Sequence, residues 1–215
     1  MSKKGKVISA VVVVAGCLAL AGSVMQNNSQ ANGKVSLEGF GKVLEKEYKN
    51  PEDASTKNLY AKGKYSEITK SNMKKAIVYY KSAGMSDEEA EKEAYKYEKE
   101  SAAFYTEAIK AGCETTDKEV ADYVSDIRTE YEEKKMDEAS LKEFDEIIAQ
   151  FDSPEDYWKY EKTIYRELLP MIKYNKQLEK EYNEKHADAS EESWEKYFNN
   201  YKSELVEKED FKLVK

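Results

Sequence analysis

Very few residues in this sequence have the chemistry or the spacing of a catalytic or metal-binding site. His186 is the single histidine, and no second histidine or cysteine lies at a metal-ligand spacing from it. A Ser-His-Asp or Cys-His arrangement would depend on that one ring, and no nucleophile motif accompanies it. The glycine-containing segment 39–42 lacks the spacing and the hydroxyl residue of a phosphate loop. We therefore expect no catalytic residue, no metal ion and no cofactor.

Two cysteines and two arginines are the other residues with distinctive chemistry. Cys17 lies in the apolar N-terminal run, which leaves only Cys113 for the rest of the chain, so no intrachain disulfide framework is expected. We interpret Cys113 as a small apolar residue near a helix junction. Arg128 and Arg166 are the only arginines. They mark either two places that need a fixed, forked donor or, more simply, ion pairs with neighbouring helices.

Tyrosine is the abundant contact residue, with 17 copies in the chain. Its large apolar ring carries a polar tip and loses few rotamers, which suits contact with many partners. Because the tyrosines recur at helical spacing, we expect most of them in the core or at its edge. Some of these tyrosines, together with Phe104 and Trp158, are candidates for a groove that binds polypeptide clients. The candidate client-binding residues are Tyr79, Tyr80, Phe104, Tyr105, Tyr157, Trp158, Tyr160 and Tyr165.

Residues 1–25 have the pattern of a targeting or anchoring segment. Lys3, Lys4 and Lys6 precede an uncharged run over 7–25. As a helix this run would be about 28 Å long, close to the ~30 Å hydrocarbon thickness of a bilayer. The lysines on its N-terminal side would then place the rest of the chain outside the cytoplasm.

Two processing sites in the same segment give alternatives to a membrane span. The sequence Val-Ala-Gly-Cys at 14–17 resembles a lipobox, which predicts lipidation at Cys17, although the residues after it stay apolar. The small-x-small sequence at 19–21 instead fits cleavage of a secretory leader. All three alternatives predict an extracytoplasmic protein, anchored to the membrane in the first two and secreted in the third.

The charge balance bears on the class of partner. The whole chain has a formal net charge of −8, and the first 30 residues contain three lysines and no acidic residue. The remainder is therefore more acidic than the whole. An acidic surface repels phosphate backbones, so we expect no binding to nucleic acid.

Beyond the leader, the sequence predicts a linker over 26–58 and a single mainly α-helical domain over 59–215. Residues 37–48 within the linker have the pattern of one short helix. The domain is large enough to bury a sizeable core. Its helix signals are N-cap residues and capping boxes at the start and glycines at the end. These signals are Thr69 and Ser71, Gly84, Ser86 with Glu89, Gly112, Thr116 with Glu119, Ser153 with Pro154, and Ser190.

Two further features refine this domain. Pro170 interrupts an apolar helical stripe and should kink that helix, because proline removes an amide donor and clashes with the preceding turn. Segment 59–65 has strand character, and the tail 210–214 alternates in part. We expect the tail to return and pair with the segment near Leu59 as a short strand pair.

From about Tyr60 to Tyr182 the sequence resembles the N-terminal helical chaperone domain of the SurA and PrsA family of extracytoplasmic folding factors. The resemblance covers more than half of the chain, and its specificity comes from the order and spacing of three weak motifs. These motifs are Gly-Lys-Tyr-Ser-Glu-Ile-Thr-Lys-Ser at 63–71, Ala-x-x-Ala-Gly at 108–112 with Thr-Asp-Lys-Glu-Val at 116–120, and Phe-Asp-Ser-Pro-Glu-Asp-Tyr-Trp at 151–158 before Leu168 and Leu169.

The resemblance implies a helical cradle for unfolded exported polypeptides, completed by the chain end, here 194–211. One departure limits what it implies. Family members with isomerase activity carry a parvulin domain of roughly a hundred residues between the N-terminal helices and the C-terminal helix. Here only the polar stretch near 181–192 lies between them, and paired histidines are missing. Prolyl isomerase activity is therefore not expected.

The sequence thus predicts a membrane-tethered or secreted, non-catalytic, chaperone-like protein whose partners are unfolded or partly folded exported polypeptides. The alternative from a different class is a structural or adaptor protein of the envelope that docks one specific partner. A third interpretation is a member of the prolyl isomerase family that lacks activity. Binding of many unrelated peptides would favour the chaperone, and one tight partner would favour the adaptor.

Overall fold

The computed structural model describes residues 36–51, 58–186 and 190–214, and the fold over these ranges is mainly α-helical, as expected. The segment 1–25 lies outside them, and so does Cys17. The described helices are α2 (Glu38–Lys49), α3 (Lys70–Ser82), α4 (Asp87–Lys110), α5 (Asp117–Glu132), α6 (Glu138–Ile148), α7 (Pro154–Lys185) and α8 (Glu191–Glu209). The strands are β1 (Leu59–Lys62), β2 (Glu67–Thr69) and β3 (Lys212–Leu213).

The helix ends follow the capping signals of the sequence. The Ser86 hydroxyl accepts from the Glu89 amide, and the Glu89 carboxylate accepts from the Ser86 amide at 3.0 Å. Thr116 and Glu119 form the same reciprocal pair at the start of α5. Two glycines end α3 and α4 with φ angles of +91° and +76°, a backbone conformation that a side chain disfavours. The ends of the helices in each hairpin are therefore determined by interactions between residues that are close in sequence.

Helix α2 is part of the folded domain. The short helix expected within the linker does form, but its apolar residues Leu37, Phe40 and Leu44 are almost fully buried in the core. It packs against α3 and α6. Since a solvated spacer would expose this face, residues 36–49 belong to the folded domain, and the predicted boundary at residue 59 leaves them out. Helical periodicity over 37–48 was too short to distinguish a packed helix from a solvated one.

The three strands form one small antiparallel sheet in the order β2-β1-β3. Ala61 is opposite Leu213 and Lys62 is opposite Lys212, so the predicted pairing of the tail with the segment near Leu59 is confirmed. Strand β2 was not expected. Its three residues lead directly into the N-cap of α3, which hides a strand signal of that length.

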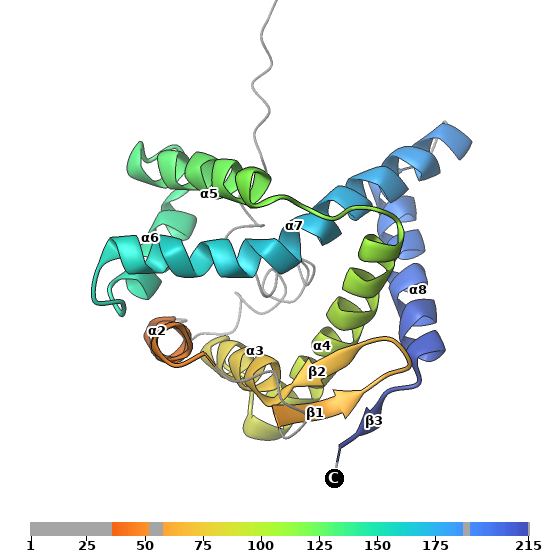
Figure 1. Cartoon of the computed structure of the whole chain (residues 1–215), viewed down its shortest axis with the longest axis horizontal. Helices are drawn as coiled ribbons and strands as arrows, with labels where there is room; N and C mark the ends of the chain where they lie inside the picture. Colours follow the sequence, from red (N-terminus) through yellow and green to blue (C-terminus); the bar gives the residue numbers. More distant parts are fainter. Residues whose placement is uncertain (1–35, 52–57, 187–189, 215) are drawn as a thin grey trace, which may run out of the picture.

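Helix α7 crosses the whole domain and contacts α4 and α5. Figure 1 shows it changing direction about halfway along its length, as expected for a helix with Pro170 inside it. Proline has no amide hydrogen to donate to the carbonyl four residues earlier, so the helix is free to bend there. The buried face of α7 carries Tyr157, Trp158, Tyr160, Glu161, Tyr165, Leu168, Leu169, Pro170, Met171, Tyr174 and Leu178.

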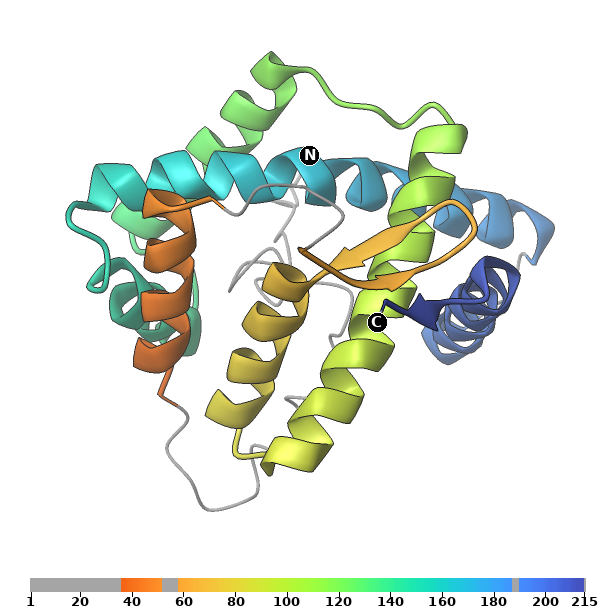
Figure 2. The same cartoon turned by 60° about the horizontal axis from the view of Figure 1, so that its bottom comes forward.

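The end of the chain folds back on the rest of the domain. Helix α8 packs against α4, and Figure 2 shows β3 emerging from α8 beside the β1–β2 hairpin. Lys202, only 7% exposed, pairs with Glu100 of α4 at 2.9 Å. The Glu209 carboxylate accepts from the backbone amides of Tyr65 and Ser66 at 2.7 and 3.1 Å. The tail is thus fixed to the hairpin turn by charge-assisted hydrogen bonds.

In the ranges that the structure describes, no helix is long and apolar enough to cross a membrane.

Gly63 is required for this contact between the tail and the hairpin. A Cβ atom on Gly63 would lie 2.5 Å from a Glu209 carboxylate oxygen and 3.0 Å from the Phe211 ring. We expect Gly63→Ala to lower the free energy of unfolding by about 1–3 kcal/mol, because the carboxylate must leave its amide donors or the strands must shift. Urea denaturation of the full chain measures this change.

The matched control is Gly39→Ala in α2, where no atom lies within 4 Å of the added carbon. Since alanine is the better helix former, the free energy of unfolding should stay the same or rise by up to about 1 kcal/mol. Equal destabilisation by both substitutions would contradict the proposed clash at Gly63.

Candidate functional site

The aromatic residues predicted to line a client groove lie mostly in the core. Only Tyr105 is half-buried, and it lines a cavity. The other seven are at most 9% exposed, so they offer no surface to a client in this structure, and this part of the prediction is corrected. Core and groove residues have the same helical spacing, so periodicity alone did not separate them. The buried seven are Tyr79, Tyr80, Phe104, Tyr157, Trp158, Tyr160 and Tyr165.

These rings instead hold the helices together. Trp158 of α7 stacks on Phe144 of α6, with the ring centroids 6.0 Å apart. Phe104 of α4 lies 5.3 Å from Tyr174 of α7 and 5.2 Å from Phe198 of α8. Aromatic pairs at such distances stabilise a fold beyond their buried area. The tyrosine-rich composition therefore serves the core, as expected for the majority of these residues.

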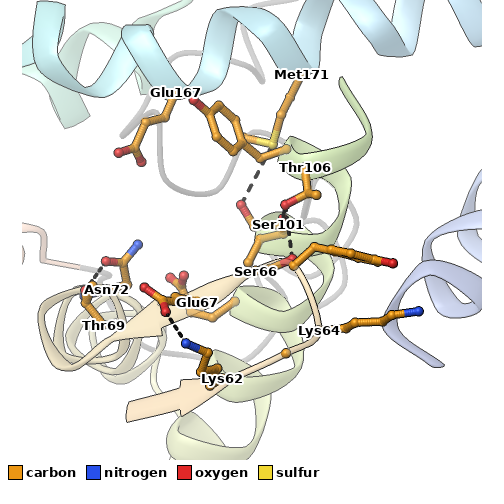
Figure 3. Close-up of a pocket in the computed structure, with 15 residues that line it drawn as sticks. Lys62, Lys64, Ser66, Glu67, Thr69, Asn72, Ser101, Thr106, Glu167 and Met171 are labelled. Carbon is orange, nitrogen blue, oxygen red and sulfur yellow. Dashed lines mark hydrogen bonds and ion pairs between the residues drawn. The ribbon is translucent and has the colours of Figure 1, made fainter. Parts of the chain in front are cut away.

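A cleft of about 440 Å³ lies between the β1–β2 hairpin, α4 and α7. Figure 3 shows α7 above the cavity, α4 beside it and the hairpin below it. The cleft is lined by Lys62, Gly63, Lys64, Tyr65, Ser66, Glu67, Thr69, Asn72, Glu98, Ser101, Ala102, Tyr105, Thr106, Glu167 and Met171. Its volume lies in the usual range for ligand pockets.

Polar side chains occupy much of the cleft wall. The Ser66 and Thr106 hydroxyl oxygens lie 3.0 Å apart and join the hairpin to α4. The Thr106 hydroxyl also lies 3.0 Å from the Ala102 carbonyl and can donate to it, while the Ser101 hydroxyl contacts the Met171 sulfur at 4.0 Å. Figure 3 shows the Ser101 and Met171 side chains meeting across the cavity. The cleft is therefore a mixed surface that can satisfy hydrogen bonds as well as contact apolar groups.

Glu98 of α4 is the least expected residue of the cleft, because it is a carboxylic acid that is only 6% exposed. Burial raises the pKa of Glu98 to about 7, against the opposing effects of the Lys75 charge and a hydrogen bond with Asn72. The carboxylates of Glu167 and Glu47 act in the same direction as burial. A carboxyl group with this pKa changes its charge near neutral pH.

The position of Glu98 in the sequence contains a signal that it is buried. Glu98 follows Ala94 by four residues and precedes Ser101 by three, so it falls on the small-residue stripe that α4 turns inward. The same reasoning applies to Glu161, which lies four residues from both Tyr157 and Tyr165 on the buried face of α7. Glu98 and Glu161 differ from the many solvated carboxylates because each lies among the small or apolar residues on the buried face of its helix.

Glu167 and the buried ion pair behind the cleft extend this cluster. Glu167 is exposed to solvent through the cleft, yet desolvation by the surrounding protein raises its pKa. Lys75 of α3 is buried and pairs with Glu47 of α2 at 3.0 Å. Three carboxylates thus lie around one buried ammonium group, since Lys75 also acts electrostatically on Glu98 and Glu167.

Strand β2 forms the floor of the cleft with its outer edge. The sheet order places β1 on one side of β2 and no strand of the described chain on the other. Ser66, Glu67 and Thr69 line the cavity, and Figure 3 shows the strand facing it. An edge strand presents backbone donors and acceptors that can pair with another extended chain. The cleft therefore combines a sheltered strand edge with acidic side chains.

A second surface feature is the aromatic cluster where α7 ends and α8 begins, formed by Tyr182, His186, Trp194, Tyr197 and Tyr201. The Tyr182 ring stacks on His186 at 4.3 Å and lies 4.8 Å from Tyr197, which is 40% exposed. His186 is exposed. This aromatic cluster is open to solvent and separate from the cleft.

The other singled-out residues have structural roles. Arg128 pairs with Glu155 of α7 at 2.8 Å and with Glu132 of its own helix. Arg166 pairs with Asp117 of α5 at 3.0 Å. The expected ion pairs with neighbouring helices are confirmed. Cys113 is buried near the α4–α5 junction, in the position expected for a small apolar residue.

Among the described residues, no group of histidine, cysteine, aspartate and glutamate side chains is arranged to hold a metal ion. Comparison with known protein families, curated proteins and solved structures finds no match to this chain.

The buried carboxyl groups make stability depend on pH. Glu161 is 2% exposed, and burial raises its pKa to about 7 from an ordinary value of 4.5. Between these two values the folded protein keeps a proton that the unfolded chain has released. We therefore expect the free energy of unfolding to fall as pH rises from about 4.5 to 7, with Glu161 contributing about 3 kcal/mol.

Urea denaturation at several pH values measures this effect in Glu161→Gln. The variant should show a smaller loss of stability across that pH window, because glutamine does not titrate. Glu179→Gln, on the exposed face of the same helix, is the matched control and should keep the slope of the unmodified protein. If the free energy of unfolding falls equally with pH in the unmodified protein and in both variants, Glu161 is not the source of the pH dependence.

Proposed function

We propose that this protein is a chaperone-like binding protein that holds extended segments of unfolded polypeptides without catalysis. One observation carries the proposal: the cleft of about 440 Å³ is open to solvent and has the edge of strand β2 along its floor. An extended segment that pairs with a strand edge is held by main-chain hydrogen bonds, which every sequence can form. Such a site suits many clients with weak affinity for each.

The walls of the cleft fit this role. Ser101 and Thr106 offer hydroxyl groups, while Ala102, Tyr105 and Met171 offer apolar contact. A bound segment would therefore find partners for both its backbone and its apolar side chains. Binding of this kind makes and breaks no covalent bond, and the client is released chemically unchanged. This replaces the predicted groove of core aromatic residues with a different surface of the same domain.

The N-terminal segment supports an extracytoplasmic location as part of this proposal. Lys3, Lys4 and Lys6 followed by the apolar run would direct the domain across the membrane, whether the segment spans the bilayer, is lipidated at Cys17 or is cleaved. Unfolded exported chains emerge on that side of the membrane. The acidic surface would keep a complex with such clients soluble.

The aromatic cluster favours a second candidate, an envelope adaptor that docks one specific partner. Exposed tyrosine and tryptophan side chains are enriched at the energetic centres of protein interfaces. At the end of α7, the exposed Tyr197 packs against the half-buried Tyr182 and Trp194. In the adaptor the aromatic cluster would be the binding site, and the cleft would have no role. The two proposals therefore place the functional surface on different residues.

Suppression of client aggregation separates these proposals. We expect the full chain, reconstituted in lipid nanodiscs, to suppress aggregation of a chemically unfolded client at near-stoichiometric amounts, measured by light scattering. Ser101→Phe places a ring in the cleft and should remove most of the suppression, because the ring occupies the space of the bound segment. Circular dichroism and urea denaturation verify that the variant is folded.

Tyr197→Ser, which alters the aromatic cluster, is the matched variant on the other surface and should suppress aggregation as the unmodified protein does. Loss of suppression in Tyr197→Ser but not in Ser101→Phe would move the site to the aromatic cluster. No suppression even at a large molar excess of the unmodified protein would contradict the chaperone proposal.

A further inference from the structure

We propose that the cleft selects extended segments that carry a lysine or arginine, and that Glu98 and Glu167 receive the cationic end of that side chain. This inference rests on the proposed function, because it assigns a substrate class to the same cleft. It goes beyond that function because strand pairing alone shows no preference among side chains.

The charges that face into the cleft are unbalanced. Lys62 pairs with Glu67 at 2.9 Å, so these two side chains neutralise each other at the rim. Figure 3 shows Lys64 extending away from the cavity and Glu167 reaching toward it from α7. The inner wall therefore has two carboxyl groups, Glu98 and Glu167, and no lining cation directed at them.

The groups behind the wall do not correct this imbalance. Lys75 acts electrostatically on Glu98, but it pairs directly with Glu47 and its charge is shared among three carboxylates. An ammonium or guanidinium group that enters the cleft would add a second positive charge beside Lys75. Two cations would then be close to the three carboxylates of Glu47, Glu98 and Glu167. Burying an ionised carboxylate without a compensating charge costs free energy. A cation bound at this point would supply that charge, so its binding should be favourable.

The geometry of a bound strand brings one side chain to this position. Successive side chains of a strand point to opposite faces, so a segment paired with β2 directs alternate residues toward α4 and α7. Glu98 lies on α4 and Glu167 on α7, both lining the same cavity. One basic residue of the segment can therefore contact both carboxylates while its neighbours point away. Recognition would require a single lysine or arginine and tolerate variation on either side.

Cation binding should be linked to the ionisation of Glu98. The groups that act on this carboxyl are Asn72, Lys75 and Tyr80 from α3, Glu167 from α7 and Glu47 from α2. Because burial raises the pKa of Glu98 to about 7, part of the protein carries a protonated Glu98 at neutral pH. A bound cation stabilises the ionised form, so affinity for a basic segment should increase as pH rises from 6 to 8.

Binding of matched peptides to the full chain in nanodiscs tests this inference. The probes are fluorescently labelled unstructured peptides that are identical except for one central residue, which is lysine, arginine, norleucine or glutamate. We expect the lysine and arginine peptides to bind at least about tenfold more tightly than the norleucine peptide at pH 8, as measured by fluorescence anisotropy. The glutamate peptide should bind most weakly.

Glu98→Gln and Glu167→Gln should each reduce the preference for lysine, and Glu98→Gln should also abolish its pH dependence. Glu88→Gln, on the exposed first turn of α4, is the matched control and should retain both properties. The second cleft variant keeps the test informative if replacement of the buried Glu98 unfolds the domain. Circular dichroism of each variant identifies such unfolding.

The outcomes separate this inference from the proposed function. Equal affinity for the lysine and norleucine peptides would overturn the inference and leave the proposed function intact. Failure of all four peptides to bind would overturn both. Full displacement of the lysine peptide by n-butylamine at a similar concentration would show that the site takes a free amine rather than a polypeptide, and would also overturn the inference.

Discussion

The fold depends on the burial of one long face of α7. This face contacts α5 and α6 through Tyr165 and Trp158, and it contacts α4 through Tyr174. A helix that contributes to two groups of neighbours cannot move toward one without leaving the other, because close-packed rings do not deform continuously. The roof of the cleft is therefore held in place by packing on both sides. A cavity persists beneath it because α7 is fixed at a distance from the hairpin.

The buried carboxyl groups oppose the stability of this arrangement, because they are removed from water. Glu98 is desolvated beside other carboxylates, and Glu161 is desolvated inside the aromatic core. Replacing such groups by apolar residues is often neutral or stabilising, so their presence is weak evidence for a role in stability. For Glu161 the structure provides a hydrogen bond with Tyr157. Glu98 differs because it also lines a cavity, which is where perturbed acids most often serve a function.

Sequence reasoning succeeded where the determinants were local. The capping pairs at Ser86 and Thr116, the glycines that end α3 and α4, and the return of the tail to β1 all follow from neighbouring residues or from strand pattern. It failed where the outcome depends on what the rest of the chain covers. Tyr157 and Trp158 have the spacing of a groove and of a core alike, and α2 has the spacing of a packed or solvated helix. The cleft was not predicted, because its three walls come from segments far apart in sequence.

Both edges of the small sheet are protected against uncontrolled pairing with another chain. An exposed strand edge is a template for aggregation, and proteins protect it by shortness, charge or cover. Strand β3 is only two residues long and begins with Lys212, so its edge is blunted. The outer edge of strand β2 lies inside the cleft, where α4 and α7 flank it and shield it from the open surface. A partner must therefore enter the cleft to pair with β2, as the proposed function requires of an extended segment.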